Sequence, residues 1–228
     1  MSIAENLQQV KEKITEAAVR SGRDPESVKI VAVSKTHTVE IIKEAYDIGI
    51  KTFGENRIQE AIDKIPLLPG DIDWHMIGHL QSNKAKHAVE FFNVIQSVDS
   101  IKIASKIEAE CAEINKNLKI MIQLDLAREE TKFGVEEESF FKLCDYVKEY
   151  CPHMELIGLM CIHPLFIESE RTRPYFKSLR EYLELYNDKY PNKIHHLSMG
   201  MSNDYEVAVE EGATIVRIGT AIFGERNK

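Results

Sequence analysis

Small and hydroxyl-bearing residues gather near the end of the sequence, in two segments that could together bind an anion. Residues 196–204 read HLSMGMSND, and residues 215–220 read IVRIGT. Each segment is a short apolar run that ends in Gly, Ser or Thr, where accessible backbone N–H groups suit a phosphate. Arg217 adds a permanent cation between these donors. The two segments therefore predict a site for a phosphorylated ligand.

Lys35 is the residue best placed for covalent chemistry with such a ligand. It follows an apolar run, and strand alternation puts it on the same side as Val31 and Val33. If these residues fill the interior of a barrel, burial and a nearby arginine would favour the neutral amine. A neutral lysine can attack an aldehyde and form a Schiff base. The alternative is an ordinary surface lysine beyond a strand end, solvated or paired with Glu55.

Two further polar residues follow predicted strands. The Asn56 amide could hydrogen-bond a phenolate or carbonyl oxygen of a ligand, or it could cap the next helix. His79 could be a ligand or an acid, although a single histidine near a helix start is more often structural. Ser198 does not lie in a GxSxG motif, and no HExxH motif occurs. The sequence therefore predicts neither a nucleophilic triad nor a metal site.

The overall composition limits the classes of function. The formal charge is 29 − 37 = −8, which argues against a surface for nucleic acid or anionic membrane. The four cysteines show no CxxC spacing and are expected to be free thiols in a reducing compartment. Neither a signal peptide nor an apolar run of about 18 residues is present, so no membrane span is predicted. We expect a cytoplasmic protein and a monomer.

The elements that must position these residues alternate along the chain. Apolar, β-rich segments are predicted at 28–34, 51–55, 74–77, 93–98, 119–126, 156–162, 195–199 and 214–218. Each segment except the last is followed by a helix, at 39–48, 57–65, 83–90, 101–113, 136–150, 169–190 and 204–211. Capping boxes of Ser2 with Glu5 and of Asn203 with Glu206 predict the starts of an N-terminal helix and of the last helix.

Strict alternation of eight strands with helices predicts a single (β/α)₈ TIM-type barrel over residues 1–228, with an extra N-terminal helix. An open, doubly wound sheet is the alternative architecture. The absence of GxGxxG after the first strand removes the main argument for its dinucleotide-binding form. In a barrel the carboxyl ends of all strands share one mouth, and phosphate is commonly held after strands seven and eight. The anion-binding segments identified above follow these two strands.

Taken together, these motifs resemble those of the pyridoxal-phosphate homeostasis protein family (the YggS/PROSC type). The strings that carry the resemblance include AVSKT around Lys35, FGEN ending at Asn56, LSMGMSNDY and VRIGTAIFGE. They occur in the same order and at compatible spacing from the first strand onwards. Several are long and chemically unusual, so the resemblance is specific.

The resemblance implies a barrel similar to the N-terminal domain of alanine racemase, with pyridoxal 5′-phosphate (PLP) as its cofactor. Lys35 would form a Schiff base with PLP, and Arg217 would face the pyridine nitrogen. Asn56 would lie beside the ring, and Met199 would pack near the cofactor. The phosphate would be held by Ser198, Gly200, Gly219 and Thr220. At His163, before a proline, the family more often has a small residue. The resemblance therefore does not predict the shape of the mouth near His163.

Within this family resemblance, the favoured function is a non-enzymatic PLP carrier or buffer. Its partners would be PLP-dependent apoenzymes or PLP-synthesising enzymes. Arg217 cannot accept a proton and would keep the pyridine nitrogen unprotonated, which weakens carbanion chemistry. Only 228 − 217 = 11 residues follow Arg217, so the second domain of the racemases, with its catalytic tyrosine, is not expected.

Two alternatives stay open at this point. A PLP-dependent amino-acid racemase or lyase could use His79, His163 or a tyrosine as its base. A barrel enzyme without PLP could act on a phosphorylated metabolite, with Lys35 as a plain electrostatic contact.

Overall fold

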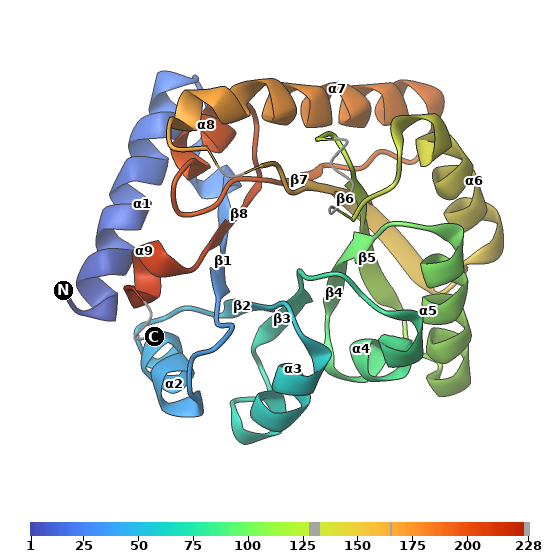
Figure 1. Ribbon diagram of the computed structural model, residues 1–228, viewed down its shortest axis with the longest axis horizontal. Helices are drawn as coiled ribbons and strands as arrows, with labels where there is room; N and C mark the ends of the chain where they lie inside the picture. The colour runs from blue at the N-terminus through green and yellow to red at the C-terminus, as the bar shows by residue number, and fades with distance from the viewer. Residues whose placement is uncertain (128–132, 165, 226–228) are drawn as a thin grey trace.

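Eight parallel strands close into a barrel in the computed structural model, which describes residues 1–127, 133–164 and 166–225 (Figure 1). The strands are β1 (Lys29–Val33), β2 (Thr52–Glu55), β3 (Asp73–Met76), β4 (Val94–Val98), β5 (Leu118–Leu124), β6 (Met154–Cys161), β7 (His196–Ser198) and β8 (Ile215–Ile218). They pair in sequence order, and β1 closes the barrel by pairing with β8, Lys29 opposite Ile215. The predicted TIM-type barrel is confirmed. Residues 128–132, 165 and 226–228 of the predicted domain 1–228 lie outside the described residues.

Helices surround the strands on the outside of the barrel (Figure 1). They are α1 (Ile3–Arg20), α2 (Val39–Asp47), α3 (Ile58–Lys64), α4 (Ala85–Phe91), α5 (Ile101–Ile114), α6 (Phe140–Tyr150), α7 (Arg173–Lys189), α8 (Tyr205–Glu210) and α9 (Thr220–Phe223). The extra N-terminal helix, α1, packs against α8 and α9. Its predicted capping box is confirmed, because Ser2 Oγ accepts from the Glu5 N–H and Glu5 Oε2 accepts from the Ser2 N–H.

Two local predictions near the end of the chain were wrong. The capping box of Asn203 with Glu206 does not form, because Asp204 occupies the N-cap position of α8. Glu206 instead pairs with two cations of α1, Lys13 at 3.6 Å and Arg20 at 3.5 Å. The last strand was expected to lack a following helix, but the short helix α9 begins directly after Gly219.

Strand alternation divides the core into two layers. The larger apolar cluster lies between the barrel and its helices, and includes Phe53, Trp74 and Ile95. A smaller cluster fills the barrel interior and consists of Val31, Val94, Met121, Met160 and Ile215. The predicted inward direction of Val31 is therefore confirmed. Because successive residues of a strand face opposite sides, Arg217 shares the interior side of β8 with Ile215.

All four cysteines are buried free thiols. Burial raises the pKa of Cys111 to about 11 and the pKa of Cys144, Cys151 and Cys161 to about 12. The reactive thiolate is therefore scarce at pH 8 in the native protein. We expect Ellman's reagent to label fewer than one thiol per chain in the folded protein and four in guanidinium. Fast labelling of any cysteine in the native state would contradict this burial.

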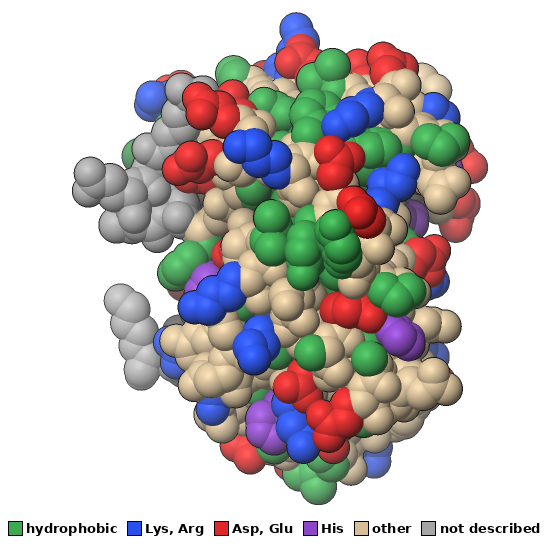
Figure 2. Space-filling view, turned by 90° about the vertical axis from the view of Figure 1, so that its right-hand side faces the viewer, with side chains coloured by type: hydrophobic (Ala, Val, Ile, Leu, Met, Phe, Trp, Pro, Cys, Tyr) green, Lys and Arg blue, Asp and Glu red, His purple; other side chains and the backbone are tan. Residues whose placement is uncertain are grey.

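The described surface carries no marked single-sign field on the face shown in Figure 2. Lys and Arg side chains are intermixed there with Asp and Glu, and hydrophobic groups lie between them. Such a mixed surface lacks the basic stripe that marks nucleic-acid-binding proteins. Among the described helices, none combines the length and the apolar character that a bilayer crossing requires.

Candidate functional site

A cavity of about 610 Å³ opens at the mouth formed by the carboxyl ends of the strands. Five of the eight predicted site residues line it: Lys35, Asn56, Arg217, Gly219 and Thr220. The other described residues of its lining are Val33, Ile77, Gly78, Ile162, Met201, Ser202, Asn203 and Asp204. The cavity thus collects strand ends and loops that are distant in sequence, which is the usual construction of a barrel active site.

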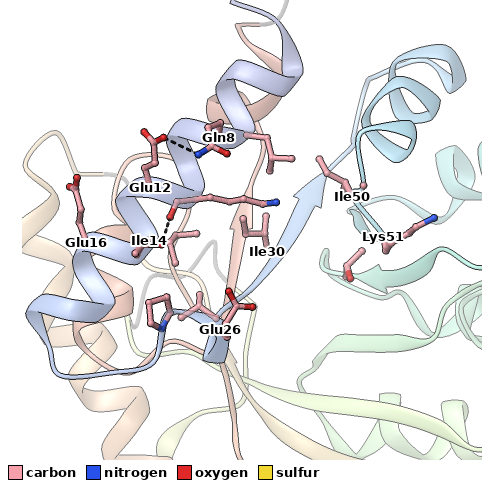
Figure 3. A pocket seen from close by; sticks show the side chains of 15 residues that line it. Gln8, Glu12, Ile14, Glu16, Glu26, Ile30, Ile50 and Lys51 are labelled. Carbon is pink, nitrogen blue, oxygen red and sulfur yellow. Dashed lines mark hydrogen bonds between the residues drawn. The ribbon is translucent and has the colours of Figure 1, made fainter.

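A second cavity, of about 620 Å³, lies between α1 and the amino-terminal ends of β1 and β2 (Figure 3). Its lining includes Ile14 of α1, Ile30 of β1 and Ile50 before β2, together with the charged residues Glu12 and Lys51 (Figure 3). In barrels this end of the strands usually serves stability rather than chemistry. We therefore assign the candidate site to the mouth.

Lys35 lies in the turn that follows β1, and its side chain is half-buried. The next residue, Thr36, has a left-handed backbone with φ 68°. This conformation is unfavourable for a β-branched residue and costs about 1–2 kcal/mol. Backbone strain of this kind is commonly kept where a neighbouring side chain has a function. The strained turn is consistent with the predicted role of Lys35, which stays a prediction.

An acidic and basic cluster behind β2 fixes this turn. Glu60 accepts the backbone N–H of Thr36, and it also pairs with Lys64. Lys64 donates to the Ser34 carbonyl at 3.1 Å and pairs with Glu55 at 3.2 Å. Burial raises the pKa of the Glu55 carboxyl, although Lys64 and Ser34 act in the opposite direction. Lys64 therefore provides a cation for Glu55, and the alternative of a Lys35–Glu55 pair stays a prediction.

Arg217 brings a buried cation to the cavity, with only 4% of its surface exposed. Its Nη1 donates to Ser198 Oγ at 2.7 Å, and its Nη2 donates to the Cys161 carbonyl at 2.8 Å. Burial lowers the pKa of the guanidinium, whereas the Asp204 carboxylate raises it. Arginine keeps its proton under such conditions. Ser198 and the Cys161 carbonyl are both neutral, so the positive charge of Arg217 is suited to an electron-rich group of a ligand.

The other three predicted residues lie next to the cavity rather than in its lining. Ser198 is fully buried and donates its hydroxyl to Gln96 Oε1 at 2.6 Å. Met199 belongs to the outer apolar cluster. Gly200 has φ 90°, and a Cβ there would lie 2.5 Å from the Cβ of Ala208. This glycine therefore allows α8 to pack closely. The predicted contacts of these three residues with a ligand stay predictions.

Asn56 lines the cavity at the end of β2. The alternative in which it caps the following helix is wrong, because Arg57 holds the N-cap position of α3. Sequence reasoning did not single out Gly78, which also lines the cavity, whereas the Met201–Asn203 loop of the lining belongs to the predicted anion-binding segment 196–204. Ser202 Oγ accepts the Ala221 N–H of α9 at 3.2 Å and so joins the loops after β7 and β8.

The two histidines considered as bases lie outside the described lining of the cavity. His163 is 3% exposed, its Nδ1 lies 2.6 Å from the Pro164 carbonyl oxygen, and its Nε2 lies 3.2 Å from Asp204 Oδ2. Asp204 in turn accepts the Met201 N–H at 2.8 Å. His163 therefore supports the loop after β7 from behind. His79 lies 3.1 Å from Asp99 and stacks on Phe133.

Comparison with known proteins identifies related sequences over nearly the whole chain. Residues 2–227 match the family described as alanine racemase, N-terminal domain. The chain is 43% identical over 227 residues to the pyridoxal phosphate homeostasis protein of Aquifex aeolicus, with 99% of each chain covered. It is 40% identical over 232 residues to the protein of that name from Escherichia coli K12, with 99% of this chain and 97% of the relative covered.

Solved structures extend this likeness to three dimensions. PipY of Synechococcus elongatus, solved with PLP bound, is 37% identical and superposes with a TM-score of 0.85, covering 98% of this chain and 100% of PipY. Alanine racemase of Clostridium difficile shares the barrel fold, with 17% identity and a TM-score of 0.70. There the alignment covers 98% of this chain but 58% of the racemase. The chain therefore belongs to the pyridoxal phosphate homeostasis protein family and has the barrel of the alanine racemase N-terminal domain.

Proposed function

We propose that this protein binds PLP in the cavity at the barrel mouth and holds it as a Schiff base on Lys35. The observation that carries the proposal is that Lys35, in the turn after β1, and Arg217, on the paired strand β8, line one cavity. PipY, with which the chain shares its family and fold, was solved with PLP bound. When bound, PLP supplies an aldehyde that condenses reversibly with an amine.

The residues of the cavity fit the separate parts of PLP. The Arg217 guanidinium offers donors only, so it suits a pyridine nitrogen that acts as an acceptor. Gly219 and Thr220 stand at the start of α9, and Ser202 lies beside them on the loop after β7. Backbone N–H groups at such a position suit a phosphate. Asn56 is left to hydrogen-bond a ring substituent.

We further propose that the protein carries or buffers PLP and does not turn over an amino acid. No histidine or tyrosine is among the described residues that line the cavity. A racemase or lyase needs a placed base besides the lysine. An arginine opposite the ring nitrogen also disfavours a carbanion. PLP-dependent apoenzymes of the cytoplasm are the recipients that we expect.

The test is a spectrum of the purified protein after incubation with PLP and desalting, recorded before and after borohydride. We expect about one PLP per chain, a band that borohydride removes, and a phosphopyridoxyl mass on the Lys35 peptide. A protein that stays colourless would overturn PLP binding. Exchange of amino-acid α-protons with deuterium that disappears in the Lys35→Ala variant would overturn the carrier role in favour of an enzyme.

A further inference from the structure

A continuous series of polar side chains crosses the otherwise apolar interior of the barrel. From Arg217, Nη1 lies 2.7 Å from Ser198 Oγ, which lies 2.6 Å from Gln96 Oε1. Gln96 Nε2 lies 2.7 Å from His75 Nδ1, and His75 Nε2 lies 3.2 Å from Asp73 Oδ2. We call these five residues the interior chain. Four of them are at most 4% exposed, and only Asp73 reaches the rim at the amino-terminal strand ends.

The chemistry of the two ends gives the interior chain one direction. Arg217 has donors only, so Ser198 Oγ must accept from it. The Ser198 hydroxyl then donates to Gln96 Oε1, and the Gln96 amide N–H donates to His75 Nδ1. His75 must therefore carry its proton on Nε2, which donates to the Asp73 carboxylate.

Asp73 supports this direction from the far end. Burial alone would raise the pKa of its carboxyl, but the His75 N–H donor and the Lys29 ammonium outweigh burial and hold the pKa at about 2. Asp73 is therefore ionised near neutral pH and can only accept. A rotated Gln96 amide would present N–H donors to Ser198 and leave its hydroxyl without an acceptor in the chain. Buried polar groups rarely tolerate such a loss.

We propose that Gln96 and His75 are positioning residues that hold the Arg217 guanidinium in place for the ring nitrogen of the cofactor. This inference rests on the proposed binding of PLP at the mouth. Among the described residues, Arg217 donates hydrogen bonds to Ser198 and the Cys161 carbonyl and to no carboxylate, so its position depends on these two neutral groups. The Ser198 oxygen in turn faces Arg217 as an acceptor only while the Ser198 hydroxyl donates its hydrogen bond to Gln96 Oε1. The interior chain thus links the cofactor site to the opposite end of the barrel.

The first test needs no cofactor. In the ¹⁵N-histidine-labelled apoprotein, long-range ¹H–¹⁵N spectra report which nitrogen of His75 is protonated. His75→Gln assigns the signal, and His196, which lies nearby and whose pKa burial lowers, is assigned in the same way. We expect a protonated Nε2 and an unprotonated Nδ1 for His75. A proton on Nδ1 would overturn the direction of the interior chain and with it the proposal.

The second test removes and then restores the hydrogen bonds of the interior chain at Gln96. Gln96→Met removes both hydrogen bonds, whereas Gln96→Glu still accepts from Ser198 and should bring a proton to His75 Nδ1. Met121→Leu changes the packing of the same interior and removes none of the hydrogen bonds of the interior chain. We expect Gln96→Met to release PLP about tenfold faster, the effect of one lost hydrogen bond, and to shift the ring ¹⁵N signal of labelled PLP. Gln96→Glu and Met121→Leu should stay within about twofold of the wild type.

The outcomes separate the two proposals. If Gln96→Met behaves like Met121→Leu in both readouts, the positioning role is wrong even though PLP binds. If the wild-type protein takes up no PLP, the proposed function fails and the role towards the ring fails with it, while the histidine spectra still decide whether the chain exists. Should Gln96→Met not fold, Ser198→Ala breaks the same chain one link closer to Arg217.

Discussion

Replacing Lys35 by Ala will abolish the borohydride-reducible band and the phosphopyridoxyl adduct, because no other lysine is among the described residues that line the mouth cavity. PLP should still reach the site through its phosphate and ring nitrogen, so weak, non-covalent binding will persist. The measurement is PLP retained after desalting, together with mass analysis of the borohydride-treated protein.

Lys35→Arg separates covalent from electrostatic binding. A guanidinium keeps the positive charge but does not lose the proton that an attacking amine must lack. We expect the same complete loss of the adduct as in Lys35→Ala. Lys43→Ala, at an exposed position of α2, is the matched control and should leave the adduct unchanged. An adduct of normal yield in Lys35→Arg would place the Schiff base on another lysine.

Gly78→Ala will strongly destabilise the folded protein, and it will also weaken PLP binding. Gly78 follows β3 and lines the cavity, and a Cβ there would lie 2.2 Å from the backbone oxygen of Asn56. Backbone cannot yield as a flexible side chain can, so β2 and β3 would have to separate. Overpacking of this kind costs about 3 kcal/mol, which lowers Tm by roughly 6–12 °C in a chain of this size. Thermal unfolding of the apoprotein measures the effect directly.

Gly70→Ala provides the control for the loss of a glycine. Gly70 is exposed, and a Cβ there would meet nothing within 4 Å. Its unfolding free energy should change by no more than about 0.5 kcal/mol. If Gly78→Ala were as stable as Gly70→Ala, the close approach of the β2 and β3 ends would be incorrect.

The barrel could be predicted from the sequence because its signals are local and repeated. Apolar runs of strand length alternate with helical periods, and the observed β1 (Lys29–Val33) and β5 (Leu118–Leu124) lie within one or two residues of the predicted bounds. The helix α9 was missed because four residues carry too short a period to detect. The capping box at Asn203 failed because α1, which is distant in sequence, provides Glu206 with cations.

The site was predictable only in part, for a related reason. Strand alternation gives the side of the barrel that a residue faces, which was enough to direct Lys35 to the interior side of the mouth. Strand alternation does not say which side chain that residue will contact. The family resemblance assigns Ser198 to a phosphate, which stays a prediction, and it gave no indication that the Ser198 hydroxyl donates to Gln96, about a hundred residues earlier in the sequence. His75 and Gln96 interrupt apolar strands, and that interruption was the available signal.

The pairing of β1 with β8 has a consequence for the order in which the molecule is made. Within the barrel, Lys35 follows the strand that is synthesised first and Arg217 lies on the strand that is synthesised last, so the ribosome makes the two halves of the site far apart in time. The pairing of β1 with β8 also joins the two strands that are most distant in sequence and closes the longest loop, so we expect it to form late in folding. A nascent chain therefore has no complete cavity, and capture of a ligand there reports that the barrel has closed.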